Sequence, residues 1–429
     1  MRWNLRVTGL LAVFALACTA GRSSIRAGPY LQSATPSGIW IVWETASGEE
    51  STVVWGPSES LGEESVGSAR QGRGRSRVHE VQLTGLSPDT TYFYQVRTGA
   101  RISEIYDFHT PPDPASESAF RLLAMSDMQM DRAHRDQFSE IVSDGILPLV
   151  STDGASRLSE ALALTLIPGD LVDDGRDYSQ WTDHFFGPAA PLLAHVPTYP
   201  VMGNHEDDSE HYLRYFHLPE NGTEGYAEHW YYTDYSNLRV IGLDSNSDYR
   251  LSTQLDWLRD LLDATCEVES IDFVFAQLHH PFQSELWLDG ETEWSGEVVA
   301  LLEDFSSSCD KPSLHFFGHT HGYSRGQSLD HNHLWVNVAT AGGKIDYWGE
   351  YDQTDYDQFS VSQDEWGFVL VELTAGEDPS FTLQRISRGS EDSPVDNLLT
   401  DEITIRRINS PPESPAGLSP GAEAVHPDD

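Results

Sequence analysis

The segment Thr198-Tyr199-Pro200-Val201-Met202-Gly203-Asn204-His205-Glu206 joins a short apolar run to a group of polar side chains. Apolar runs of this length, bounded by glycine, are typical of buried strands. The same pattern occurs at four other places: Phe120 to Met125 ends at Ser126-Asp127, Leu162 to Pro168 ends at Gly169-Asp170, Ile271 to Leu278 ends at His279, and Leu314 to Phe317 ends at Gly318-His319-Thr320-His321. Ligand sites of α/β sheets lie beyond the carboxyl ends of the strands, so these endings predict one polar rim.

Amphipathic helices separate these strands, for example at Thr253 to Ala264 and at Gly296 to Phe305. Apolar strands that alternate with such helices favour a layered α/β domain. The Asp, Asn and His side chains at the rim offer oxygen and nitrogen donors, which suit Zn, Fe or Mn, and a bridging carboxylate can hold two cations close together. A single Gly-Asp or His-x-His is common without a metal, but five polar strand endings in order favour a metal site.

The charge of the chain excludes several classes of partner. The 429 residues include 26 Lys+Arg and 68 Asp+Glu, which gives a formal net charge of −42. Nucleic acids and anionic membrane surfaces are bound through Lys and Arg, so we expect neither as a partner of this surface. The hydrophobic fraction of 39% excludes a chain that is disordered throughout.

Residues 1–18 predict an export signal. Arg2 and Arg6 precede the apolar run Val7 to Ala17, which is too short for a membrane-spanning helix and has the length of a signal-peptide core. The run ends at Cys18 in a sequence that resembles a bacterial lipobox, so that Cys18 would be lipidated; cleavage near Ala20 is the alternative. We expect an exported protein that is either a lipoprotein, attached to a periplasmic or cell-surface membrane only through its N-terminal lipid, or secreted. The sequence indicates no oligomeric state.

Export also affects the interpretation of the other two cysteines. Cys266 and Cys309 each follow a helical stretch and precede an apolar strand. If those strands are parallel neighbours, both thiols lie at the same end of the sheet. The pair is then either a disulfide, which an oxidising compartment permits, or two buried thiols.

The pattern is different before residue 112. Residues 26–112 contain short runs rich in β-branched and aromatic residues between turn signals, which is typical of a small all-β sandwich. Within it, Leu83 to Tyr94 resembles the LxxLxPxTxYxY corner of fibronectin type III modules. A proline-rich linker leads to the α/β domain at 118–390. Residues 391–429 are rich in Pro, Ser and acidic residues, and we expect a largely disordered tail in which only Ile403 to Ile408 has strand character.

Taken in order, the polar endings at Asp127, Asp170, Asn204-His205, His279 and His319-Thr320-His321 resemble the motifs of the metallophosphoesterase (calcineurin-like) superfamily. The segment Gly28-Pro29-Tyr30-Leu31-Gln32 resembles the N-terminal domain of purple acid phosphatases and their bacterial relatives. The resemblance covers about residues 27 to 390. It implies a four-layer α/β (α+β) sandwich, with helices flanking two mixed β-sheets and a dimetal site along one edge, preceded by an all-β fibronectin III-like sandwich.

The resemblance also implies a role for each polar residue at the rim. It assigns Asp127, Asp170 and His321 to a first metal, and Asp170, Asn204, His279 and His319 to a second, so that Asp170 bridges the two. His205 remains as the histidine that stabilises the transferring phosphoryl group or protonates the leaving oxygen. The family places the fourth-motif ligand two residues before a proline, so Pro281 selects His279, with His280 as the alternative.

Two positions depart from the family pattern. Purple acid phosphatases have a tyrosine three residues after the bridging aspartate, where this chain has Asp173, so we do not expect a purple protein. Many superfamily members have Asp-x-His in the first motif, where this chain has Asp127-Met128-Gln129. A carbamoyl oxygen can ligate a divalent cation, more weakly than imidazole, and we include Gln129 among the expected metal ligands.

These features predict an acid phosphatase-like phosphomonoesterase that needs two divalent or trivalent metal ions, with Fe, Zn or Mn as the candidates. A hydroxide bridging the ions would be the nucleophile, and Asp170 and His205 would be the catalytic residues. We expect a small phosphate ester as substrate, because the aromatic stretches near the rim lack the Arg or Lys cluster that grips a polyanion. The alternatives are a phosphodiesterase of the same fold and a surface-anchored binding protein with a structural metal site.

Two aromatic stretches accompany the rim. The first lies between Glu206 and Asp234, and we expect its rings to pack as a satellite core more readily than to stack on a substrate. The second runs from Tyr347-Trp348 to Phe359 and is in a position to cover the site from the other side.

Overall fold

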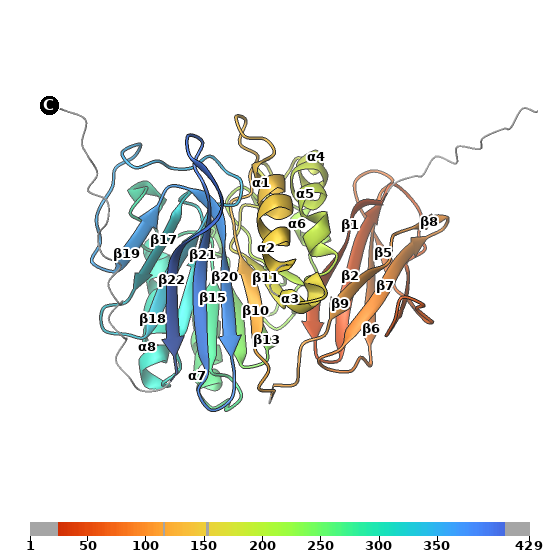
Figure 1. The fold of residues 1–429 in the computed structure, drawn as a ribbon, viewed down its shortest axis with the longest axis horizontal. Helices are drawn as coiled ribbons and strands as arrows, with labels where there is room; N and C mark the ends of the chain where they lie inside the picture. The colour runs from red at the N-terminus through yellow and green to blue at the C-terminus, as the bar shows by residue number, and fades with distance from the viewer. Residues whose placement is uncertain (1–24, 115, 152–153, 408–429) are drawn as a thin grey trace, which may run out of the picture.

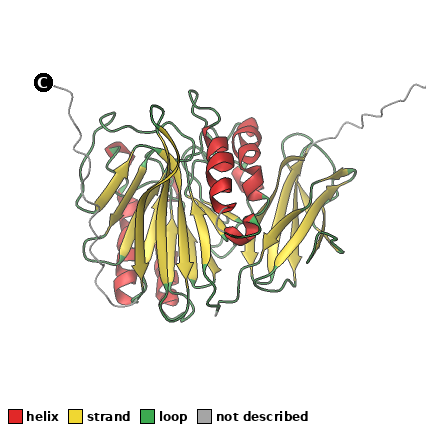
Figure 2. Ribbon diagram, viewed as in Figure 1, coloured by secondary structure: helices red, strands yellow, loops and turns green. Residues whose placement is uncertain are grey.

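A computed structural model describes residues 25–114, 116–151 and 154–407 of the chain. The described part consists of an N-terminal all-β sandwich and a larger domain with two sheets and most of the helices (Figures 1 and 2). The predicted export signal with Cys18 lies outside the described residues.

The N-terminal sandwich has two antiparallel sheets, in the strand orders β1-β2-β6-β5 and β4-β3-β7-β8, with β9 paired to β7. Alternate side chains of both sheets, among them Leu31, Ile41 and Val96, are buried between them, which is the two-residue period of a strand with one face in the core. The strands are β1 (Ile25–Thr35), β2 (Gly38–Thr45), β3 (Thr52–Gly56), β4 (Glu63–Val66), β5 (Ser68–Gln71), β6 (Arg77–Thr84), β7 (Thr91–Thr98), β8 (Arg101–Ile102) and β9 (Tyr106–His109).

The segment that resembled a purple acid phosphatase N-terminal domain lies at the contact between the sandwich and the larger domain. The Tyr30 hydroxyl donates to the backbone oxygen of Tyr215 at 2.6 Å, and the Gln32 side chain accepts from the backbone N–H of His217 at 2.7 Å. The buried carboxylate of Glu44 accepts from the hydroxyls of Tyr178 and Tyr215 at 2.8 and 2.9 Å. These hydrogen bonds join the two domains through buried polar groups.

The larger domain contains two mixed sheets, as predicted. The six-stranded sheet has the order β12-β11-β10-β20-β21-β22 and the seven-stranded sheet has the order β13-β14-β15-β16-β18-β17-β19. The strands are β10 (Phe120–Ala124), β11 (Leu164–Ile167), β12 (Thr198–Pro200), β13 (Tyr231–Tyr235), β14 (Leu238–Gly242), β15 (Phe273–Gln277), β16 (Ser313–Phe317), β17 (Tyr323–Gln327), β18 (His333–Val338), β19 (Phe359–Gln363), β20 (Trp366–Thr374), β21 (Ser380–Gly389) and β22 (Pro394–Arg406). The Phe275 and Phe381 rings, one from each sheet, meet edge to face with centroids 5.0 Å apart.

Helices cover the outer faces of these sheets. α7 and α8 pack on the seven-stranded sheet, because Leu255, Leu258 and Leu262 recur at helical spacing and are buried against residues of β14 and β15. The remaining longer helical segments lie between the sheets and the N-terminal sandwich (Figure 1). The helices are α1 (Gln137–Glu140), η1 (Ile141–Ile146), α2 (Leu147–Ser151), α3 (Leu158–Ala161), α4 (Tyr178–Gln180), η2 (Trp181–Phe186), α5 (Gly187–Leu193), α6 (Tyr212–Tyr215), η3 (Ser247–Tyr249), α7 (Ser252–Cys266), η4 (Leu288–Gly290) and α8 (Glu293–Ser308).

The expectation of a largely disordered tail from residue 391 is wrong as far as Arg406. Pro394–Arg406 forms β22, which pairs antiparallel with β21 over its whole length. This part of the tail is ordered because it pairs with β21, which would otherwise be an unpaired edge strand. In addition, Ile405 is buried against the core, and the Asp401 carboxylate accepts hydrogen bonds from Arg325 and Tyr323. The last residues of the predicted tail, 408–429, lie outside the described part.

Cys266 and Cys309 form a disulfide with their Cα atoms 5.2 Å apart. Cys266 is the last residue of α7, and Cys309 directly follows α8. Strands β15 and β16, which follow these helices in the chain, are parallel neighbours, so the two cysteines lie at the same end of the sheet. Of the two alternatives that the sequence left open, the structure contains the disulfide.

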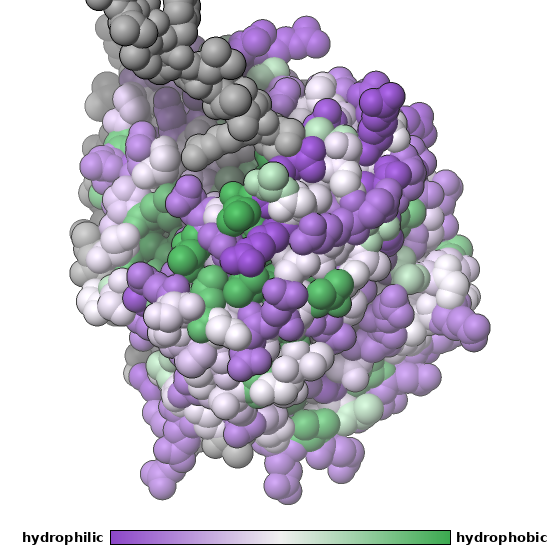
Figure 3. Space-filling model, turned by 90° about the vertical axis from the view of Figure 1, so that its right-hand side faces the viewer, coloured by the Kyte–Doolittle hydropathy of each residue, from purple (hydrophilic) through white to green (hydrophobic). Residues whose placement is uncertain are grey.

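The surface has the polarity that the composition indicates. The face of the molecule shown in Figure 3 is covered mainly by hydrophilic side chains, and hydrophobic ones gather only in small groups. No helix in the described ranges combines the length and the apolar character that a membrane crossing requires.

Candidate metal centre

The five polar strand endings meet at one place. Asp127 and Asp170 follow neighbouring parallel strands, β10 and β11, of the six-stranded sheet, and His279 and His319 follow neighbouring parallel strands, β15 and β16, of the other. Two groups of side chains converge there: Asp127, Asp170 and His321, and Asp170, His279 and His319. Within each group the donor atoms lie within 4.8 Å of one another. These groups agree with the two ligand sets that the family resemblance implies, and they share Asp170.

The donor atoms lie close together, and Asp127, Asp170 and His279 are buried. His279 Nε2 lies 3.2 Å from Asp170 Oδ2, and His321 Nε2 lies 3.2 Å from Asp127 Oδ1. Asn204 Oδ1 lies 3.0 Å from His279 Nε2, so the structure brings this carbamoyl group to the second set. His280 belongs to neither group, and its Nδ1 instead lies 3.0 Å from the Ser245 hydroxyl.

Backbone carbonyls orient the buried His279 and the partly exposed His321. His279 Nδ1 donates to the carbonyl of Pro168 at 2.9 Å, and His321 Nδ1 donates to the carbonyl of Lys344 at 2.7 Å. In addition, the backbone N–H of His321 donates to the Asp346 carboxylate at 2.7 Å. A hydrogen bond at Nδ1 leaves Nε2 unprotonated in the neutral ring, and this is the nitrogen that each histidine directs at the carboxylates.

Three of the converging residues have an unusual backbone conformation. Asp127, Asp170 and His319 have φ values of 59°, 54° and 71°, in the left-handed region that residues other than glycine seldom adopt. Such conformations are most frequent at functional sites, where the surrounding structure enforces them. The glycines of two motifs have a related role, because a Cβ atom at Gly203 would collide with Asp170 and one at Gly318 would collide with Asp127.

Glu206 is a residue of the centre that sequence reasoning missed. Its fully buried carboxylate accepts backbone N–H groups from both sides: Gly203 and Asp170 donate to Oε2 at 2.7 and 2.9 Å, and Leu171 and Val172 donate to Oε1 at 2.8 and 3.4 Å. Glu206 therefore fixes the loop that carries Asp170 against the loop that carries Asn204. The signal was its position directly after Asn204-His205, but an acidic residue in a loop does not by itself indicate what it binds.

Gln129 lies in the centre, and only one end of its side-chain amide has a hydrogen-bond partner among the described residues. Its Nε2 donates to Asp170 Oδ2 at 2.6 Å, whereas its Oε1 is buried and has no hydrogen-bond partner among the described residues. A buried oxygen without a partner costs free energy unless a ligand satisfies it. Gln129 Oε1 is therefore free to face a cation, while the NH₂ group of the same side chain contacts the Asp170 carboxylate.

The electrostatics favour cations at both groups. Burial lowers the pKa of His279, but the charges of Asp170 and Asp127 outweigh it and raise that pKa to about 9. Burial likewise opposes protonation of His321, yet Asp127 and Asp346 raise its pKa to about 10. The carboxylates therefore stabilise a positive charge beside them, which a proton or a metal ion can supply. Three imidazoles, two carboxylates and two carbamoyl groups fit a pair of metal ions of the Fe, Zn or Mn type.

His205 lies at the edge of the two groups. Its Nε2 is 3.9 Å from Asp170 Oδ2, and its Nδ1 lies 2.7 Å from the backbone carbonyl of Asp173, to which it can donate. The side chain is 37% exposed, so the free face of the ring meets solvent beside the shared carboxylate. Asp173, which stands where purple acid phosphatases have a tyrosine, thus contributes its backbone to the site.

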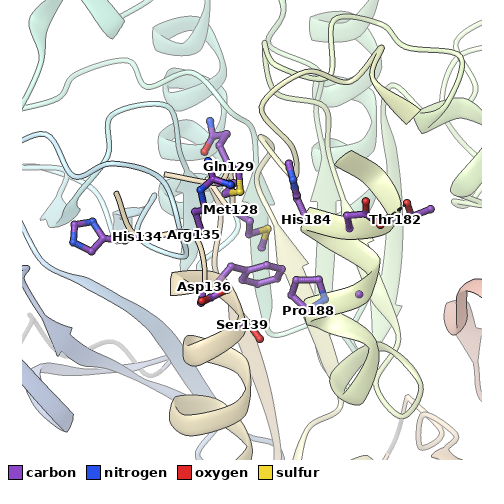
Figure 4. A pocket seen from close by; sticks show the side chains of 14 residues that line it. Met128, Gln129, His134, Arg135, Asp136, Ser139, Thr182, His184 and Pro188 are labelled. Carbon is purple, nitrogen blue, oxygen red and sulfur yellow. Dashed lines mark hydrogen bonds between the residues drawn. The ribbon is translucent and has the colours of Figure 1, made fainter. Parts of the chain in front are cut away.

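A pocket of about 570 Å³ adjoins the first group at Gln129. Met128, Met130, Phe138 and Pro188 give it apolar surface, and Arg135, Asp136, Asp183 and His184 give it charged or titratable groups of both signs. In Figure 4 the Arg135 side chain points toward Gln129, and His184 lies on the facing wall.

Residues 120–323 match the family model of the calcineurin-like phosphoesterases, and residues 28–110 match that of the purple acid phosphatase N-terminal domain. Residues 120–323 form a calcineurin-like metallophosphoesterase domain. The larger domain of this chain has the metallophosphoesterase-like fold.

Individual relatives are distant. The chain is 25% identical over 274 residues to the protein named "Probable inactive purple acid phosphatase 24" of Arabidopsis thaliana, covering 58% of this chain and 43% of the relative. It is 25% identical over 242 residues to a nucleotide pyrophosphatase/phosphodiesterase of Hordeum vulgare, covering 51% of this chain and 63% of the relative. The chain thus spans less than two thirds of the length of either relative.

A solved structure shows the same fold over most of the chain. The purple acid phosphatase PPD1 from seeds of yellow lupin (Lupinus luteus) superposes with a TM-score of 0.67 at 19% identity, covering 88% of this chain and 73% of that protein. The coverage includes more than the phosphoesterase domain, which agrees with a shared arrangement of N-terminal sandwich and larger domain.

Proposed function

We propose that this protein hydrolyses phosphate monoesters with two metal ions bound between Asp127, Asp170, His279, His319 and His321. The observation that carries the proposal is the pair of ligand groups that share the buried Asp170, with the half-exposed His205 beside them. Asn204 and Gln129 would complete the two sets. The metal ions are divalent or trivalent, with Fe, Zn or Mn as the candidates.

When bound, two such ions would lower the pKa of a water molecule to supply the nucleophile and would neutralise charge on the phosphoryl oxygens. Asp170 would hold both ions, and the carbonyls of Pro168 and Lys344 would keep His279 and His321 in the orientation that directs Nε2 inward. The carbonyl of Asp173 fixes the His205 ring through Nδ1. Burial lowers the pKa of His205, but the charge of Asp170 outweighs it and raises that pKa, so that the protonated ring would donate from Nε2 to the leaving oxygen.

A second candidate is a phosphodiesterase. A diester has two organic groups, and the pocket of about 570 Å³ beside Gln129 offers room for an additional one. The barley relative carries the name nucleotide pyrophosphatase/phosphodiesterase, which supports keeping this candidate.

One experiment distinguishes these functions from a binding protein with a structural metal site. The purified protein is analysed for bound metals, and 4-nitrophenyl phosphate and bis(4-nitrophenyl) phosphate are compared as substrates with Mn, Zn, Fe and Mg added in turn. We expect the monoester to be cleaved with the higher kcat/KM. Preference for the bis-ester would support the phosphodiesterase, and a metal-loaded protein that cleaves neither ester would support the binding protein.

We also propose that the protein is exported as a lipoprotein modified at Cys18. The Cys266–Cys309 disulfide supports this, because disulfides persist in oxidising compartments. Cys18→Ser should move the protein from the membrane fraction to the soluble fraction of the producing cells. An unchanged membrane association in Cys18→Ser would contradict lipid anchoring.

A further inference from the structure

An aromatic wall stands next to the second ligand group. The Trp287 ring lies beside the ring of His319, with centroids 5.2 Å apart and planes tilted by 35°. Tyr351 lies on Trp287, with ring centroids 5.6 Å apart. We call Trp287 and Tyr351 the aromatic wall. It extends from a residue of the ligand group to the protein surface, because Tyr351 is 40% exposed.

Exposed aromatic side chains are rare on this surface. In the described ranges, Trp348 and Tyr351 are the only aromatic residues in the exposed class, at 47% and 40%. Both belong to the loop that follows Gly343, next to the centre. Large apolar groups left in water at one place, on a protein that is otherwise strongly acidic, indicate a surface that binds something apolar.

The loop that carries Tyr351 is tied to the centre at several points. Its Lys344 carbonyl accepts from His321, and its Asp346 carboxylate accepts from the His321 backbone. Further along, the backbone of Leu288 donates to the carbonyl of Asp352 at 3.3 Å, which joins the Tyr351 segment to the Trp287 segment. The wall is therefore held in a fixed place relative to the centre, as a binding surface must be.

The charges around the wall select the kind of ring that it would accept. Asp289 and Asp352 are exposed neighbours of the two aromatic residues in the chain, and the nearby ammonium of Lys344 is already paired with Glu350. The charged groups that act on Tyr351 are Asp346, Glu350 and Lys344, so acidic groups outnumber basic ones at this end of the wall. An uncharged ring gains from contact with the wall, whereas a negatively charged one is repelled.

We propose that the aromatic wall binds the leaving group of the substrate, and that the preferred substrates are phosphate esters of uncharged aromatic alcohols. This inference rests on the proposed function, because it takes the phosphoryl group to be bound at the ligand groups. The ring of the ester stacks on Trp287 and Tyr351 beside His319. The pocket at Gln129 then has no part in holding the aromatic ring of a monoester.

The test measures binding without turnover. Phenylphosphonate and methylphosphonate keep the anionic head group, and their carbon–phosphorus bonds are not hydrolysed as esters are. Their Kd values for the metal-loaded protein are measured by titration calorimetry. We expect phenylphosphonate to bind more tightly than methylphosphonate, and 4-carboxyphenylphosphonate to bind more weakly than phenylphosphonate because of its added charge.

Substitutions in the aromatic wall test whether it causes the preference for phenylphosphonate over methylphosphonate. Tyr351→Ala should reduce the ratio of phenyl to methyl affinity about two- to tenfold, which is the range for one aromatic contact, and Tyr351→Phe should keep the ratio. Trp287→Ala should reduce it further, and its bound metal is measured because Trp287 contacts His319. Leu329→Ala is the matched control: Leu329 is 66% exposed and follows β17 at the end of the sheet away from the centre, so the ratio should not change.

Three results would overturn the inference. One is an unchanged affinity ratio in both Tyr351→Ala and metal-replete Trp287→Ala. Another is loss of the phenyl preference in Ser139→Trp, which fills the pocket at Gln129, with no loss in the wall variants. The third is a metal-loaded protein that does not bind phenylphosphonate. If the wild type shows the wall-dependent preference but hydrolyses neither nitrophenyl ester, the wall binds aromatic phosphoryl compounds, whereas the proposed hydrolysis, and with it the preference among substrates, is wrong.

Discussion

Replacing Glu206 by glutamine should weaken both the fold and the metal centre. The carboxylate accepts four backbone N–H groups, at 2.7 and 2.9 Å on Oε2 and at 2.8 and 3.4 Å on Oε1. Glutamine has one acceptor oxygen and one donor group in the same space. If the oxygen keeps the pair from Gly203 and Asp170, the new NH₂ group faces the N–H of Leu171, and both are donors.

The size of the effect follows from this geometry. A buried donor without an acceptor costs about 1–3 kcal/mol, and the contact at 3.4 Å adds little, so the loss of the Leu171 bond dominates. An opposing effect reduces the loss, because burial and the charge of Asp170 raise the pKa of Glu206 to about 7 and glutamine removes that repulsion. We expect Glu206→Gln to lower the free energy of unfolding by about 2 kcal/mol.

The metal affinity should fall as well. The bonds from Gly203 and Asp170 position the two loops that carry the shared ligand and Asn204. Loss of a group that orients a metal ligand typically lowers affinity about 10- to 100-fold. Urea denaturation gives the stability, and titration of the metal-free protein with Zn or Mn gives the affinity.

The control is Glu297→Gln, the same chemical change at an exposed position inside α8. It should leave stability within about 0.5 kcal/mol of the wild type and should not alter metal binding. The reasoning is refuted if Glu206→Gln behaves like this control in both measurements.

Three further predictions concern other parts of the molecule. Asp170→Asn should lose both metals, because Asp170 belongs to both ligand groups, whereas His205→Ala should keep them and lower kcat about 100-fold or more. Elemental analysis measures the bound metal and steady-state kinetics measures kcat. A fully metallated and active Asp170→Asn variant would exclude Asp170 as the shared ligand. Burial lowers the pKa of His315 from 6.5 to about 3, so below pH 6.5 the unfolded chain takes up a proton that the folded chain does not. As the pH decreases, this residue alone should therefore lower the free energy of unfolding by about 1.4 kcal/mol per pH unit. In His315→Gln that part of the slope between pH 6 and 4.5 should disappear from the urea denaturation data. Glu44→Ala should lower the free energy of unfolding by about 2–4 kcal/mol, because the buried hydroxyls of Tyr178 and Tyr215 lose their acceptor. The double variant Glu44→Ala/Tyr178→Phe should regain part of this stability in urea denaturation, because it removes one of the two unpaired hydroxyls.

Much of the centre could be predicted from the sequence. The expected ligands come at or just after the ends of apolar strands, and parallel neighbours in a sheet bring such endings to one edge. This brings Asp127 close to Asp170 and His279 close to His319, and the packing of the two sheets brings both pairs and His321 together. The aromatic residues between Glu206 and Asp234 were also interpreted correctly as core, since Tyr212, Tyr215, Phe216, Trp230 and Tyr231 are at most 2% exposed.

Other features depend on residues that are distant in the sequence. Trp287 and Tyr351 are 64 positions apart and meet only because the segments that carry them pack together next to His319. Asp346 reaches the backbone of His321, and the strand at Pro394–Arg406 is ordered by the unpaired edge of β21. None of these contacts leaves a periodic or motif-like pattern in the chain.

The sequence by itself determined the strands and the types of side chain at the rim, because hydrophobic periodicity and donor chemistry are local properties of a chain. Only the tertiary structure decided that Cys266 and Cys309 are bonded, that Glu206 joins two ligand loops, and that the sandwich is attached through Tyr30, Gln32 and Glu44. The physical reason is that a buried hydrogen bond or disulfide needs a partner at one distance and one angle, and residues far apart in sequence reach such positions only once the core has packed.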